Sequence, residues 1–240
     1  MMAIYKRELR LCFSVGIGYL VICALLLLSG LATFLNHFVA ASTDFSLVVL
    51  RMEWGLLAAV PLLSMGSFAR ERREGTELCL AAHPISQGAI LAGKLLAGLS
   101  VLAIPTAVTA LYPLVLHSLG EIALGTAYSA LLGYLLLSVL LLSLGVLISS
   151  LCRHEAVAGG VTLAVLLVLF FLPKLAGILS LPWLSTFLVQ SNPFARLSGF
   201  AYGYFDLTGL FYYLSATALC LLLAGISMTL RRILGEGVRR

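Results

Sequence analysis

The segment RERREGTELCLAAHPISQGAILAGK, residues 70–94, is the one extended polar stretch in a chain that is otherwise strongly apolar. It contains seven charged side chains: Arg70, Glu71, Arg72, Arg73, Glu74, Glu77 and Lys94. The apolar run on each side of it is long enough to cross a bilayer. The pattern therefore predicts a loop between two membrane-spanning helices, where water-soluble machinery would make contact.

The composition of the whole chain agrees with a membrane location. Hydrophobic residues make up 61% of the 240 residues and charged residues 10%, whereas soluble domains average about 45–50% and about 25%. Each span needs about 20 apolar residues, so the length leaves room for six spans and no sizeable soluble domain. We expect an all-α integral membrane protein with one domain over residues 1–240.

The apolar runs place these spans at residues 16–37, 48–69, 92–116, 125–151, 156–173 and 207–230. Pro105 and Pro113 predict a kink in the third span. The segment 174–206 is rich in aromatic residues and broken by Pro182 and Pro193. Because aromatic rings favour the headgroup region, we expect short re-entrant or interfacial helices here. A plain aromatic belt on a long outer loop is the alternative.

Charge asymmetry predicts the orientation of the spans. Twelve of the fifteen lysines and arginines fall on one proposed side, which by the positive-inside rule faces the cytoplasm. We therefore expect a multi-pass membrane protein with both termini cytoplasmic. Arg51 and Glu53 lie near the outer end of the second span. We expect them to snorkel, to pair, or to face the bundle interior, and plain interfacial placement is the favoured alternative.

The first residues, MMAIYKRELRLCF (1–13), predict an amphipathic helix over residues 1–14 that lies at the membrane surface. Its polar residues are Tyr5, Lys6, Arg7, Glu8 and Arg10. A signal peptide is the rival interpretation. The following uncharged run, residues 11–43, exceeds the apolar core of about 7–15 residues that signal peptides have, so an uncleaved first span is expected.

Within the loop at residues 70–91, local signals predict a short helix. Gly75 and Thr76 form a plausible helix start, because a threonine oxygen can accept from the free amides of the first turn. Glu77 complements the positive end of the helix dipole. Pro84 ends the helix. We expect this helix at about residues 77–82, lying between two spans.

Two motifs resemble known sites but lack an essential residue. GAILAGK, residues 88–94, fits part of a phosphate-binding loop, but Leu95 stands where serine or threonine is required. We expect Gly93 and Lys94 instead to begin the third span, with the lysine reaching back to the interface. His154 and Glu155 begin a zinc-protease motif, yet Ala158 replaces the second histidine. We therefore expect no catalytic residue, cofactor or metal in this chain. A secondary transporter would be expected to carry ionisable residues inside its spans to couple ions to substrate, and these spans have almost none. If this chain takes part in transport, the energy would therefore come from a separate subunit.

The pattern Glu71, Gly75, Thr76, Glu77, Leu78 and Pro84 resembles the loop after the second span of ABC-2 type permeases. The opening IYKREL (4–9) and the stretch SNPFARLSGFAYGYFDLTGLFYYL (191–214) look most like the gliding-motility (GldF-like) branch.

This resemblance implies a type V exporter-like fold and a coupling helix that docks into a cytoplasmic ATPase, which binds ATP and Mg²⁺. It assigns the ATPase contact to Arg70, Glu71, Arg73, Gly75, Thr76, Glu77, Leu78 and Pro84. The surface helix around Tyr5 to Arg10 would brace the coupling helix. A second permease copy or a related permease would complete the pathway, and an extracytoplasmic auxiliary subunit is a further candidate partner.

Two other functions stay open at this point. One is a haem-exporter-like permease of cytochrome maturation. The other is a non-transporting membrane anchor that passes ATPase movement to an extracytoplasmic partner. The sequence indicates no particular cargo.

Overall fold

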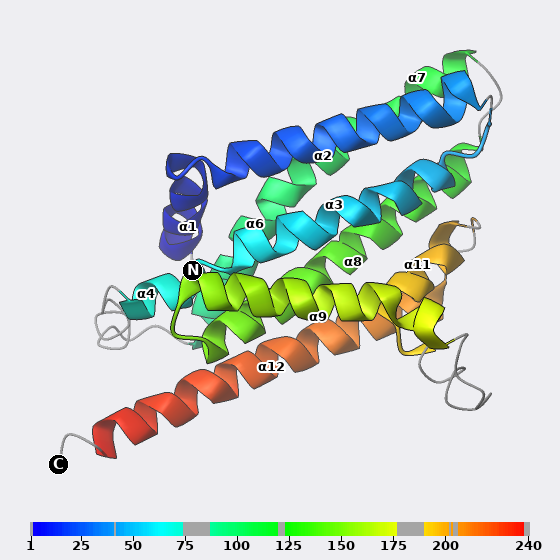
Figure 1. Ribbon diagram of the computed structural model, residues 1–240. Helices are drawn as coiled ribbons and strands as arrows, with labels where there is room; N and C mark the ends of the chain where they lie inside the picture. Colours follow the sequence, from blue (N-terminus) through cyan, green and yellow to red (C-terminus); the bar gives the residue numbers. More distant parts are fainter. Residues whose placement is uncertain are drawn as a thin grey trace.

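The computed structural model describes residues 2–40, 42–73, 87–119, 123–176, 190–201, 203 and 206–237, and these parts are helical without a strand (Figure 1). The helices are α1 Met2–Ser14, α2 Ile17–Thr33, η1 Phe34–Val39, α3 Ser46–Ser64, α4 Ala69–Arg73, α6 Gln87–Thr109, α7 Tyr112–Leu119, α8 Leu124–Leu151, α9 Glu155–Ala176, α11 Pro193–Ala201 and α12 Leu207–Gly237.

Six stretches of the described chain are long and apolar enough to cross a membrane: Ile17–Val39, Ser46–Glu71, Gln87–Ser118, Leu124–Leu151, Glu155–Leu172 and Leu207–Leu230. The prediction of an all-α protein with six spans is therefore confirmed.

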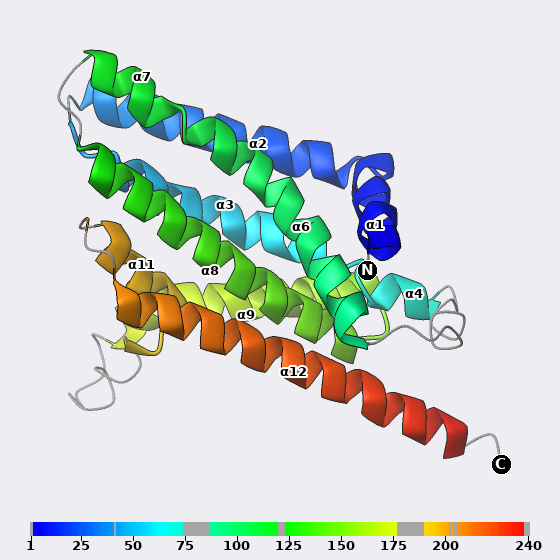
Figure 2. The same cartoon turned by 180° about the vertical axis from the view of Figure 1, so that it is seen from behind.

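Helix α8 forms the centre of the bundle and packs against α3, α6, α9, α11 and α12 (Figures 1 and 2). It is apolar on every side, as expected of a helix surrounded by others. Tyr134, Leu137 and Leu141 on α8 are fully buried. The outer helices, by contrast, leave large apolar side chains such as Leu27 on α2 and Phe211 on α12 exposed. In a membrane protein, lipid covers such surfaces.

The amphipathic helix α1 does not continue the axis of α2. Gly16, between the two helices, has a φ of 83°, which a glycine adopts without the strain that a Cβ would cause. After this turn, α1 packs against α2 and α6 at one end of the bundle (Figure 1). Ile4 is buried there, while Lys6 and Arg10 are exposed.

The third span is interrupted between its two prolines. Helix α6 ends at Thr109 and α7 begins at Tyr112, which places a turn at Ala110 and Leu111. The hydroxyl of Tyr128 on α8 donates to the Ala110 carbonyl over 3.2 Å. A neighbouring helix thus satisfies a carbonyl group at the interruption, as a kinked span requires.

The short helix α11 lies at the opposite end of the bundle from α1 (Figure 1). Asn192 caps its start, because Asn192 Oδ1 accepts from the backbone N–H of Phe194 over 2.8 Å. Its last residue, Ala201, accepts a hydrogen bond from Ser46 of α3 over 2.7 Å. Helix α11 is part of the aromatic segment for which short outer helices were expected. Residues 177–189 of that segment lie outside the described residues.

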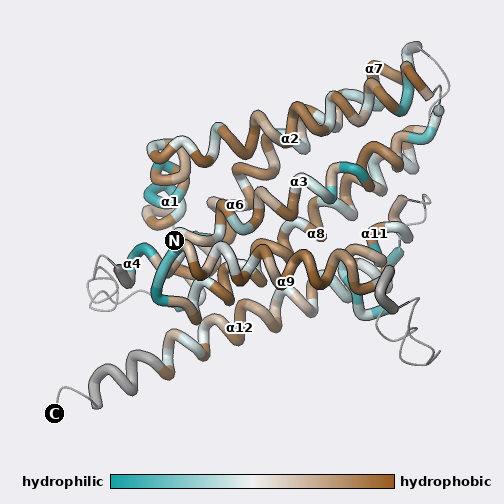
Figure 3. The backbone as a smooth tube through the Cα atoms, in the orientation of Figure 1, coloured by the Kyte–Doolittle hydropathy of each residue, from teal (hydrophilic) through white to brown (hydrophobic). Residues whose placement is uncertain are grey.

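Hydrophilic residues gather where α1, α4 and the start of α9 lie (Figure 3). We call this the charged end of the bundle. The other end, which contains α11, is called the α11 end.

Candidate functional site

A buried lysine lies at the centre of the charged end. The Lys94 ammonium on α6 is 3.0 Å from Glu8 Oε1 on α1 and 2.9 Å from Glu71 Oε1 on α4. It also donates to the backbone carbonyl of Ser67 and lies 4.6 Å from the centre of the Phe68 ring. The Lys94 side chain is only 1% exposed. Burial of a charge costs several kcal/mol, so these contacts are what make its position stable.

Two further contacts attach α1 to its neighbours. Arg7 Nη1 lies 3.4 Å from Glu71 Oε1. Because the Arg7 side chain is 43% exposed, this pair contributes little stability. The Tyr5 hydroxyl lies 3.0 Å from Ser100 Oγ on α6. Helix α1 is thus attached to both α4 and α6.

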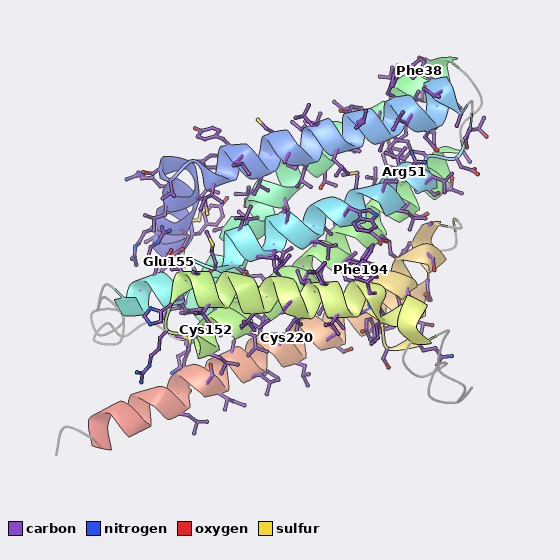
Figure 4. The ribbon with its side chains drawn as sticks, in the orientation of Figure 1. Phe38, Arg51, Cys152, Glu155, Phe194 and Cys220 are labelled. Carbon is purple, nitrogen blue, oxygen red and sulfur yellow. The ribbon has the colours of Figure 1, made fainter. Side chains whose placement is uncertain are left out.

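On its other side, α4 is attached to α9 and α8. Arg70 donates to Glu155 Oε2 through Nη2 over 3.1 Å and through Nε over 3.3 Å. Glu155 is the first residue of α9 (Figure 4). Ser149 Oγ on α8 accepts from the backbone N–H groups of Phe68 and Ala69 over 3.1 and 3.4 Å. Those amides would otherwise be buried donors without a partner. The direction in which the chain leaves α3 is therefore fixed by two other helices.

Together, Arg7, Glu8, Arg70, Glu71, Lys94 and Glu155 form what we call the ionic cluster. A cavity of about 320 Å³ lies beside it and is lined by Arg7, Glu8, Cys12, Arg70 and Glu71 with apolar residues of α1 and α3. Burial raises the pKa of the Cys12 thiol, and the Glu8 carboxylate raises it further, while Arg70 and Lys94 oppose the rise. The thiol is therefore protonated and weakly nucleophilic at neutral pH.

A family model described as ABC-2 family transporter protein matches residues 24–226. The chain belongs to the ABC-2 transporter family. Comparison with curated proteins found no match. Membership makes the chain a multi-pass membrane permease subunit, and it implies pairing with an ABC ATPase subunit. The ABC-2 match includes Arg70, Glu71, Lys94 and Glu155 of the ionic cluster, whereas α1 precedes it.

The structure describes only part of the predicted ATPase contact of this ABC-2 chain. Arg70 and Glu71 lie in the ionic cluster, and Arg73 is the last residue of α4. Gly75, Thr76, Glu77, Leu78 and Pro84 lie outside the described residues, as does the short helix expected at about residues 77–82.

The predicted residues of the surface helix divide into two groups. Tyr5, Arg7 and Glu8 contact α4 or α6, whereas Lys6 and Arg10 are exposed. Arg7 contacts Glu71 of α4, the helix that leads into the predicted coupling loop, whereas Glu8 is connected to α4 only through Lys94 of α6.

Sequence reasoning did not predict that Lys94 lies at the centre of the ionic cluster. We expected it to begin the third span and reach back to the interface, but α6 begins at Gln87, so Lys94 lies about two turns inside this helix. The paired carboxylates of Glu8 and Glu71 make that depth possible. The available signal was a lysine seven residues into an apolar helix, with acidic residues in two earlier segments. Such a lysine needs buried partners.

Proposed function

We propose that the chain is the membrane subunit of an ABC exporter and that its charged end receives movement from a separate cytoplasmic ATPase. ATP and Mg²⁺ would be bound by that partner, and this chain would have no catalytic role. The family match supports the permease assignment. The ionic cluster supports the location of the coupling.

The observation that carries the proposal is that Glu71 and Glu8 share Lys94. Helix α4 immediately precedes residues 74–86, which contain the predicted coupling helix. A force on that loop would reach α4 and α6 directly, since both adjoin it in the chain. The Glu71–Lys94 pair would hold these two helices together, Glu8 would pass the movement to α1, and the Arg70–Glu155 pair to α9. Four elements would then move together.

We further propose that the charged end faces the cytoplasm of a bacterium, across its inner membrane, with both termini on that side. A single six-span chain would be half of a permease, so a second copy or a related permease would complete the pathway. Residues 4–9 and 191–214 favour the gliding-motility branch of the family. An extracytoplasmic auxiliary subunit would bind at the α11 end.

The test is mass spectrometry of the proteins that co-purify with the tagged full-length chain in mild detergent. The variant is Glu77→Lys in the predicted coupling helix. Its matched control is Asp44→Lys, the same change of charge at an exposed residue near the α11 end. We expect the wild type and the control to retain an ABC ATPase and Glu77→Lys to lose it.

Three other results would count against the proposal. If no ATPase is retained even after cross-linking, the charged end is not its docking site. If all three proteins retain the ATPase equally, the contact does not depend on Glu77. A complex that hydrolyses ATP in liposomes but moves no material would instead favour the membrane anchor.

A further inference from the structure

A second buried charged residue lies near the α11 end, far from the ionic cluster. Glu53 of α3 is 7% exposed, and its Oε1 atom is buried without a hydrogen-bond partner. It follows Ser46, the first residue of α3, by seven positions, which corresponds to a depth of about 10 Å along the helix. Facing the bundle interior was one of the placements expected for this residue, and Glu53 adopts it.

Two phenols, Tyr134 of α8 and Tyr213 of α12, lie within electrostatic range of the Glu53 carboxyl group. The Tyr134 hydroxyl is fully buried and also lacks a hydrogen-bond partner. The Tyr213 hydroxyl donates to the Pro193 carbonyl over 2.7 Å. Tyr134 is thus a polar group without a partner in the surroundings of a carboxyl group that also lacks one.

The described cations on neighbouring elements do not pair with Glu53, because they are exposed or contact other groups. Arg51, on the same helix, is exposed. Arg196 of α11 donates to the Gln190 carbonyl and lies over the Tyr212 ring. Other described titratable groups on this side include His37 of η1, which bonds the Ser42 carbonyl, and Tyr212 and Asp206 near the start of α12. Asp44, Tyr112, His117 and Tyr128 also lie toward this end. At the other end of the bundle, the α9 residue Glu155 is paired with Arg70.

An ionised carboxylate in this position would cost several kcal/mol, because Oε1 is buried without a partner and no described cation pairs with it. A bound proton removes that charge.

We propose that Glu53 is a proton-binding site beneath α11. One Oε atom takes a proton from the aqueous phase, which neutralises a carboxylate that would otherwise be buried without a partner. No other reactant takes part. The site is separate from the ATPase coupling proposed above, and its test requires no ATPase.

The test is infrared spectroscopy of the purified full-length chain in lipid nanodiscs as the pH is varied. A protonated carboxyl group has a C=O stretching band that a carboxylate lacks. At neutral pH we expect the wild type to show one such band that is missing in Glu53→Gln, and that disappears from the wild type when the pH is raised. Asp44→Asn, which removes an exposed carboxylate, is the matched control and should keep the band.

A second variant tests whether burial of the carboxyl group is what keeps the proton bound. Tyr134→Phe retains the ring and removes the hydroxyl, and the Glu53 band should remain at neutral pH. The proposal is overturned if wild type and Glu53→Gln have the same carboxyl band at neutral pH, because Glu53 would then be ionised. Loss of the band in Tyr134→Phe would overturn the attribution of the bound proton to burial.

Discussion

Replacing Lys94 by methionine should be strongly destabilising, and its cost can be worked out from the ionic cluster. Methionine keeps the apolar stem and removes the ammonium group that Glu8 and Glu71 share. The two carboxylate oxygens lie 3.0 and 2.9 Å from the same nitrogen, so they are at most about 6 Å apart. At an effective dielectric constant of about 20, their repulsion without the lysine is about 3 kcal/mol. Loss of one member of a buried pair typically costs about 3–5 kcal/mol, which agrees.

The measurement is the free energy of unfolding in mixed micelles, obtained from circular dichroism as the fraction of denaturing detergent rises. Arg51→Met is the matched control, because Arg51 is an exposed cation of a span, and it should change stability by no more than about 0.5 kcal/mol. Adding Glu8→Gln to Lys94→Met removes the repulsion and should recover about 3 kcal/mol. The reasoning is refuted if Lys94→Met costs no more than the control, or if the double variant recovers nothing.

Three further predictions concern other contacts. Ser149→Ala leaves two buried N–H donors without an acceptor and should cost about 1–3 kcal/mol in the same unfolding assay, whereas Ser138→Ala, which loses only a bond to its own helix, should cost clearly less. Gly133→Ala should force α11 away from α8 and lower stability by about 1–3 kcal/mol, because an added Cβ would come within 2.8 Å of both Leu197 Cδ1 and Phe200 Cβ of α11. Gly125→Ala is the control, because nothing lies within 4 Å of an added Cβ there, and it should not force the helices apart. Equal effects of the two substitutions would contradict the packing of α11 against α8. Because its raised pKa leaves little thiolate at neutral pH, Cys12 should react with N-ethylmaleimide more slowly than glutathione in the same tube, as followed by mass spectrometry. Faster reaction would contradict the burial of its thiol against the neighbouring helices.

The six spans were predictable because their signal is local. A helix that crosses a bilayer needs a continuous apolar run, and each run is visible in the sequence itself. The turn between α6 and α7 was foreseeable for the same reason, since Pro105 and Pro113 act on their own backbone.

The ionic cluster was not predictable in this way, because its contacts join residues far apart in the chain. Lys94 meets Glu8 across 86 positions, and Ser149 meets Phe68 across 81. Local reasoning assigned Lys94 to the interface, because an isolated charge belongs there. Glu53 illustrates the same limit, since only the packing of α3 against α8 and α11 decides that it faces inward.

The long separation between Glu8 and Lys94 has a consequence for the newly made protein. Bacterial and other ribosomes add about 5–20 residues per second, so the 86 positions between these residues take about 4–17 s to synthesise. During this interval α1 has already been made, but the lysine that later binds it does not exist. The lipid surface must hold α1 by its apolar face until the third span is inserted. Docking of the first helix is thus a late event in the assembly of this chain.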